Sequence, residues 1–143
     1  MDSVGNENDA VDQYDAVDQY VERCRAAAQL VTPGQRVRAV GLLGRRGKRP
    51  GRGYRNVMIA VTPTRLMSFE YSDRPDRIKI LRMVADWPRS VVDVEIAPAA
   101  DTTVVRFHLI DGRDVELEDN GQPGLADRVN EPFFEALGLA ASA

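Results

Sequence analysis

The sequence is poor in the residues that build disulfide bonds and metal centres. Cys24 is the only cysteine and His108 the only histidine among 143 residues. An internal disulfide is therefore excluded, as is a zinc site built from several cysteine and histidine ligands. A nucleophilic pair of Cys24 and His108 would need a fold that brings the two together. No catalytic constellation stands out, and we expect no cofactor, no metal and no enzymatic activity.

Long hydrophobic runs and an export signal are also lacking. The apolar runs are far shorter than the ~20 residues that cross a bilayer, so no transmembrane segment is predicted. The first residues, MDSVGNENDA, are acidic and have neither the basic region nor the apolar core of a signal peptide. We expect a cytoplasmic protein, with peripheral attachment at a membrane as an alternative.

Lysine is scarce, and the basic residues that are present gather in one segment. With 43% hydrophobic and 29% charged residues, the composition is that of an ordinary globular domain. The net charge of -3 hides a strong segregation. Residues 35–60 carry eight basic and no acidic residues, whereas residues 1–34 carry seven acidic and two basic ones. One basic segment thus lies within an otherwise acidic chain, which favours an anionic or acidic partner for it.

The N-terminal region predicts a helix with a narrow apolar seam. Residues 1–8 are polar, and we expect them to be disordered. Residues 9–32 contain the repeat DAVDQY twice and predict an amphipathic helix from about Ala10 to Leu30. Its apolar residues advance by alternating steps of three and four: Tyr14, Val17, Val21, Cys24, Ala28 and Val31. Such a seam is typical of a two-helix contact, so it is a candidate for self-association; packing on its own domain is the alternative.

The segment Asn56–Tyr71 is the clearest structural signal in the chain. Val57, Ile59 and Val61 alternate with their neighbours, a polar break follows, and the alternation resumes at Met67, Phe69 and Tyr71. This pattern predicts a β-hairpin that turns between Thr62 and Arg65, where Pro63 suits a turn.

Further strands and a final helix follow the same reasoning. Strands are predicted at Gln35–Leu43, Ile78–Asp86, Val91–Ile96, Thr102–Ile110 and Arg113–Leu117. The apolar phase slips within Ile78–Asp86, which indicates a bulge or burial of both faces. Asp111-Gly112 predicts a tight type I′ turn. The helix predicted at Leu125–Leu137 contains Pro132, so we expect a kink or two short helices near Asn130.

This order of elements resembles the bacterial pleckstrin-homology-like (PH-like) and GRAM-type domains. The resemblance rests on four stretches in sequence: NVMIAVTPTRLMSFEY, WPRSVVDVEI, RFHLIDGRDVELE and NEPFFEAL. It implies a mainly β (α+β) fold, a seven-stranded antiparallel barrel over residues 35–139 with a C-terminal capping helix. The helix before Gln35 is extra to that pattern. In the lipid-binding PH domains of eukaryotes, the phosphates of phosphoinositides bind at the loop between the first two strands.

The corresponding loop in this chain is strongly basic. It contains a cluster of six basic residues, separated by glycines and a proline: Arg45, Arg46, Lys48, Arg49, Arg52 and Arg55. Such a cluster could bind an anionic lipid headgroup or RNA, or it could be a solvated loop that pairs with the acidic N-terminal helix. We predict a non-catalytic binding or adaptor module that acts through protein contacts, with this loop as an anionic ligand site. The alternative is a membrane-surface or nucleic-acid binding protein whose main site is the loop.

Overall fold

A computed structural model describes residues 2–45, 56–74, 77–98, 102–119 and 126–138, with side chains from Asp15 onward except at residues 74 and 126–128. The elements, in chain order, are α1 (Asp2–Leu30), β1 (Ala39–Arg45), β2 (Asn56–Val61), β3 (Arg65–Arg74), β4 (Arg77–Pro88), the 3₁₀ helix η1 (Arg89–Val91), β5 (Val92–Pro98), β6 (Thr103–Leu109), β7 (Asp114–Asp119) and α2 (Ala126–Ala136). Seven strands and two α-helices confirm the predicted mainly β class.

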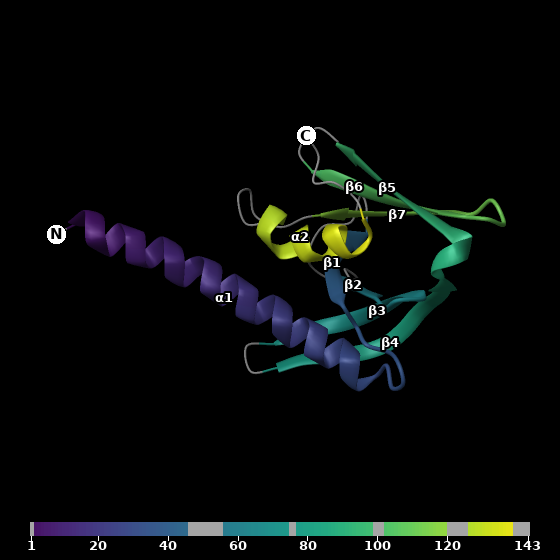
Figure 1. Ribbon diagram of the computed structural model, residues 1–143, viewed down its shortest axis with the longest axis horizontal. Helices are drawn as coiled ribbons and strands as arrows, with labels where there is room; N and C mark the ends of the chain where they lie inside the picture. The colour runs from purple at the N-terminus through teal and green to yellow at the C-terminus, as the bar shows by residue number, and fades with distance from the viewer. Residues whose placement is uncertain (1, 46–55, 75–76, 99–101, 120–125, 139–143) are drawn as a thin grey trace.

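The strands form one antiparallel sheet in the order β4-β3-β2-β1-β7-β6-β5. Figure 1 shows that the sheet is bent, so that β1–β4 and β5–β7 lie on two sides of α2, with η1 at the corner between β4 and β5. Among the described residues, the two halves are joined where β1 pairs with β7, through Gly44 with Glu118 and Arg45 with Leu117. The described ladder is open, with β4 and β5 at its ends, where a closed barrel was predicted.

One core lies on the inner face of the sheet, between its two halves. Val57, Ile59 and Val61 of β2 point into it, as their alternation predicted. It also contains the buried residues Leu43, Leu66, Val92, Val105, Phe107, Leu109, Leu117 and Phe133. Trp87 packs against this core, with its ring centroid 5.8 Å from that of Phe107. The inner core therefore joins both halves of the sheet to α2.

A second core lies on the outer face of β1–β4, beneath α1. It consists of Cys24, Ala28, Val37, Val40, Met58, Ala60, Met67, Phe69 and Tyr71. The prediction of a single interior was therefore wrong for Met67, Phe69 and Tyr71. The reason is the register of the hairpin: Val61 pairs with Leu66, so Leu66 shares the inner face and Met67 turns outward. Because α1 covers this face, β2 is buried on both sides.

The N-terminal helix is longer than predicted and belongs to the domain. It begins at Asp2 and so includes residues 2–8, which were expected to be disordered. Once a helix has formed, each further residue adds a hydrogen bond without a new nucleation cost, so the boundary is poorly marked in sequence. At the other end, Cys24 and Ala28 are fully buried in the outer core. The helix is thus part of the structure that was assigned to residues 35–139.

The structure confirms one predicted turn, corrects another and shows the cause of the phase slip in β4. The turn at Thr62–Arg65 is confirmed by the bond from the Thr62 backbone amide to the Arg65 carbonyl, 3.0 Å. The type I′ turn at Asp111-Gly112 was wrong, because only Gly112 has a positive φ, 93°. The bonds from Gly112 N to Leu109 O and from Leu109 N to Arg113 O instead form a three-residue loop. The predicted phase slip within β4 is a bulge, with register shifts opposite Ser68/Phe69 and Glu70/Tyr71.

The final helix closes the gap between β1 and β7. Asn130 is fully buried, and its side-chain amide accepts from Leu42 N (2.7 Å) and donates to Leu42 O (3.2 Å). Asn130 thereby binds the β1 backbone at a position where no strand within the described residues pairs with that edge. A Cβ atom at Gly41 would lie only 2.6 Å from the Phe133 ring, so the absence of a side chain at Gly41 lets the helix approach. The prediction of two short helices was wrong, because α2 continues through Pro132 as one helix.

Candidate functional site

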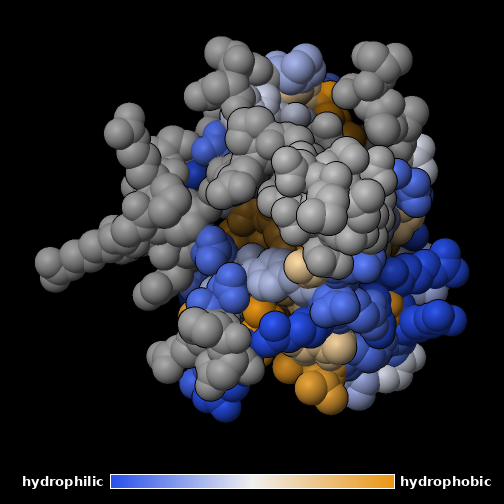
Figure 2. Space-filling model, turned by 90° about the vertical axis from the view of Figure 1, so that its left-hand side faces the viewer, coloured by the Kyte–Doolittle hydropathy of each residue, from blue (hydrophilic) through white to orange (hydrophobic). Residues whose placement is uncertain are grey.

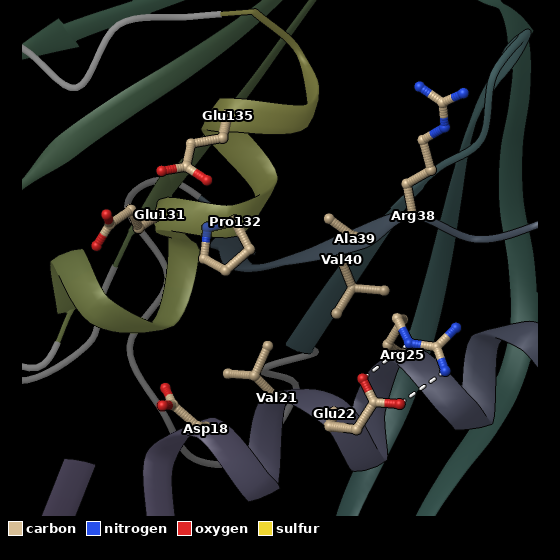
Figure 3. Close-up of a pocket in the computed structure, with 10 residues that line it drawn as sticks. All are labelled: Asp18, Val21, Glu22, Arg25, Arg38, Ala39, Val40, Glu131, Pro132 and Glu135. Atoms are coloured by element: carbon tan, nitrogen blue, oxygen red, sulfur yellow. Dashed lines mark hydrogen bonds and ion pairs between the residues drawn. The ribbon is translucent and has the colours of Figure 1, made fainter. Parts of the chain in front are cut away.

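A groove runs between the two helices, over the start of β1. We call it the helix groove; its volume is about 360 Å³. Its lining comes from α1, β1 and α2: Asp18, Val21, Glu22, Arg25, Arg38, Ala39, Val40, Glu131, Pro132 and Glu135. Figure 3 shows apolar side chains of Val21, Val40 and Pro132 between the charged residues. The groove therefore combines an apolar floor with charged walls.

Apart from Glu22, which is paired with Arg25, the charged residues of the helix groove are separated by sign. In Figure 3, Asp18, Glu131 and Glu135 lie toward one end, and Arg25 and Arg38 lie toward the other. Glu131, Glu135 and Arg38 are exposed, and none of them forms an ion pair with another described residue. These three side chains are therefore available to a ligand.

One ion pair is built into the groove wall. Glu22 accepts two hydrogen bonds from Arg25, at 2.7 and 2.8 Å, which lower the pKa of Glu22 and raise that of Arg25. Arg25 also donates to the Val37 carbonyl at 3.1 Å. This arrangement holds the Arg25 side chain between α1 and the segment before β1, so the wall is ordered.

A wider depression continues the helix groove at its basic end. Its volume is about 900 Å³, and Glu22, Arg25 and Arg38 line both hollows. Arg36 adds a third guanidinium to this end. Figure 2, viewed from the side of the α1 N-terminus, shows hydrophilic surface with smaller hydrophobic patches among it.

The C-terminal half of α1 is fixed by specific contacts. Gln29 donates to the carbonyls of Thr32 (3.1 Å) and Gln35 (2.7 Å) and accepts from the Val37 amide (2.8 Å). Tyr20 donates to Asp73 at 2.8 Å, and burial is the main cause that raises the pKa of this phenol. These bonds tie α1 to the segment before β1 and to β3.

Part of the predicted self-association seam packs against the chain's own sheet. Cys24 and Ala28 are covered by the sheet, so the alternative of packing on the chain's own domain holds for them. Val21 is half-buried and lines the helix groove, and Val17 is half-buried. The side chain of Tyr14 lies outside the described residues. Burial raises the pKa of the Cys24 thiol to about 12, which keeps it protonated.

The predicted basic site is described at one position only. Arg46, Lys48, Arg49, Arg52 and Arg55 lie outside the described residues. Arg45, at the end of β1, binds the buried carboxylate of Glu70 at 3.2 Å, and Arg82 binds the same oxygen at 2.8 Å. The alternation in β3 had suggested that Met67 and Phe69 face the interior, so Glu70 was missed. The register of the hairpin instead places Glu70 on the inner face of β3, opposite Val57.

His108 lies on the outer face of β6, whereas Cys24 lies in the outer core beneath α1 on the other half of the sheet. Its Nδ1 is 2.8 Å from Asp114, and this hydrogen bond is the main cause that raises the pKa of His108. Its Nε2 is 3.9 Å from Glu95. In the part of the chain that the structure describes, no group of His, Cys, Asp and Glu side chains is arranged to hold a metal. No described helix is long and apolar enough to cross a membrane.

No protein-family model matches the sequence, and no curated protein matches it significantly.

Proposed function

We propose that this protein is a non-catalytic, PH-like binding module that holds a charged, amphipathic segment of a protein partner in the helix groove. The PH-like part of the proposal is supported by seven antiparallel strands, by the separation of β1–β4 from β5–β7, and by α2 packed between them. The helix α1 is an addition to that arrangement. It forms one wall of the groove, so the addition and the proposed binding site coincide.

The observation that carries the proposal is the separation of charge along a hydrophobic floor. Carboxylates of Asp18, Glu131 and Glu135 mark one end, and the guanidinium groups of Arg36 and Arg38 mark the other. A complementary segment presents basic residues to the first end, acidic residues to the second and an apolar side chain between them. Charge complementarity of this kind fixes the direction in which a segment binds and excludes partners of the wrong polarity.

The size of the groove predicts a weak, reversible complex. Interfaces at the small end of the range belong to transient encounters, and we expect dissociation constants on the order of micromolar. The apolar floor of Val21, Val40 and Pro132 supplies contact area, while the exposed charges supply selectivity.

A displayed library of random peptides, selected on the full chain, tests the proposal. We expect enriched peptides to carry lysine or arginine next to an apolar residue, with affinities measured by fluorescence anisotropy. Glu135→Lys should weaken them by about 5-fold, because one exposed charge contact contributes roughly 1 kcal/mol. Asp93→Lys is the matched control: it makes the same charge change at an exposed position on β5, outside the groove.

Three results would contradict this function. The first is enrichment of peptides that lack basic residues, and the second is equal binding of the peptides to Glu135→Lys and to the unchanged chain. The third is loss of binding only when Arg46 and Arg49 are replaced by glutamine, together with retention on anionic liposomes. That result would place the main site at the basic loop.

A further inference from the structure

A second hollow lies inside the bent sheet and shares no lining residue with the helix groove. We call it the sheet cavity; its volume is about 360 Å³. Its lining comes from the ends of β1 and β7 and from β2, β3 and β4: Arg45, Val57, Ile59, Ser68, Val84, Ala85, Trp87, Val115, Glu116 and Leu117. Most of these side chains are apolar. An apolar cavity of about 150 Å³ is enough to bind benzene, so this one accepts a longer chain or a larger ring.

One polar group faces the apolar interior. Ser68 lies on the inner face of β3, opposite Ile59, and is only 6% exposed. Its hydroxyl lines the cavity and is not a buried atom without a partner, so solvent or a ligand can reach it. A hydroxyl can donate to a ligand oxygen.

A guanidinium group stands at the edge of the sheet cavity. The side chain of Arg45 is 45% exposed, and its Nη2 atom binds Glu70. The other N–H groups of the guanidinium can donate to a ligand. Arg82 binds the same Glu70 oxygen at 2.8 Å, so this buried carboxylate keeps a cationic partner even when Arg45 turns to a ligand. Glu116, also in the lining, is bonded to Arg106 at 3.1 Å.

We propose that the sheet cavity binds one small amphiphilic carboxylate, such as a medium-chain fatty acid. Its chain lies among Val57, Ile59 and Trp87, and its carboxylate accepts hydrogen bonds from Arg45. Planar guanidinium groups match carboxylates in geometry and charge, which favours an acid over an alcohol of the same length. The inference goes beyond the helix groove, because its ligand and its residues are different.

Titration of the full chain with decanoate, followed by amide NMR shifts, tests the inference. We expect a dissociation constant on the order of 10–100 μM, from typical affinities per ligand atom. The largest shifts should fall on Ile59, Ser68 and Leu117. Decanol, which has the same chain without the charge, should bind about 5-fold to 10-fold more weakly, as expected for a lost charge-assisted hydrogen bond.

One pair of variants tests the contact with the ligand's carboxylate, and a second pair tests the contact with its hydrocarbon chain. Arg45→Gln should reduce decanoate affinity to that of decanol and leave decanol unchanged, whereas Arg77→Gln, at an exposed position on β4 outside both hollows, should change neither. Val84→Phe should fill the cavity and weaken both ligands about 10-fold or more. Leu81→Phe is its control, because Leu81 lies on the same strand outside the lining and is 44% exposed, close to the 48% of Val84.

Several outcomes would overturn the inference. Absence of shifts at millimolar decanoate is one, and equal binding to Val84→Phe and the unchanged chain is another. Shifts confined to the helix groove, or lost in Glu135→Lys, would move the ligand to that groove. Equal effects of Arg45→Gln on decanoate and decanol would show that Arg45 does not bind the carboxylate. None of these results bears on peptide binding, so the two proposals fail independently.

Discussion

The outer face of β1–β4 is covered by α1, whereas the outer face of β5–β7 is exposed and carries ion pairs. In the first half, Met58 and Ala60 of β2 are fully buried beneath α1. In the second half, Arg106 of β6 bridges Glu95 (3.0 Å) and Glu116 (3.1 Å) across the three strands. Both halves contribute to the same inner core.

The difference shows that one half of a sheet can be buried on both faces while the other half is buried on one face and exposed to solvent on the other. A strand covered on both sides is apolar throughout, as β2 is from Val57 to Val61, whereas a half-exposed strand alternates, as β6 does from Val105 to Leu109. Exposed ion pairs contribute little to stability, typically less than about 1 kcal/mol, while burial of large apolar side chains contributes several. The half under α1 should therefore carry more of the free energy of folding.

The largest expected effect comes from cutting a side chain under α1. Met58→Ala removes most of a fully buried side chain from the outer core and should lower the free energy of unfolding by about 2–5 kcal/mol. Arg106→Ala, in the opposite half, should lower it far less, because ion pairs open to solvent contribute little to stability. Urea denaturation followed by circular dichroism measures both. Similar losses for the two variants would contradict the comparison.

A middle-sized effect is expected where α2 meets the inner face of β1. Gly41→Ala places a methyl group against the Phe133 ring and should cost about 1–3 kcal/mol by overpacking. Phe133→Leu makes room, so the double variant should lose less stability than the sum of the two single changes. Additive losses in urea denaturation would show that the ring does not press on Gly41.

The smallest effect concerns His108 on the exposed half. Because Asp114 raises the pKa of His108, the pair contributes stability fully below the unfolded value near 6.5 and loses it as pH rises through the higher folded pKa. His108→Gln should therefore flatten the change in urea midpoint between acidic and mildly alkaline pH. An unchanged pH profile in this variant would mean that other groups are responsible. Met58→Ala should shift the midpoint equally at every pH.

The mainly β class and six of the seven strands could be predicted within a few residues, because period-two alternation and turn residues are local signals. The first strand begins at Ala39 and not at Gln35, since the Gln29 side chain binds the backbone of Gln35 and Val37. No local pattern reveals such a contact. The seam on α1 was visible in sequence, but whether it meets another chain or its own sheet depends on tertiary packing.

The candidate sites were harder to predict than the strands. The helix groove joins residues from three elements that are far apart in sequence, and no motif marks them. The sheet cavity depends on which face of β3 carries Ser68 and Glu70, and this is decided by the pairing of Val61 with Leu66 across the turn. A shift of one residue in that register would exchange the two faces.

Asn130 lies 88 residues after Leu42, whose backbone it binds. During synthesis all seven strands leave the ribosome before this amide can occupy its place beside β1. Until then the Leu42 peptide and the bare surface of Gly41 are an unprotected edge on which another growing chain could pair. Helix α2 therefore protects the edge of β1 only at the end of synthesis. A chain that stops before α2 should associate with other copies of itself instead of folding as a monomer.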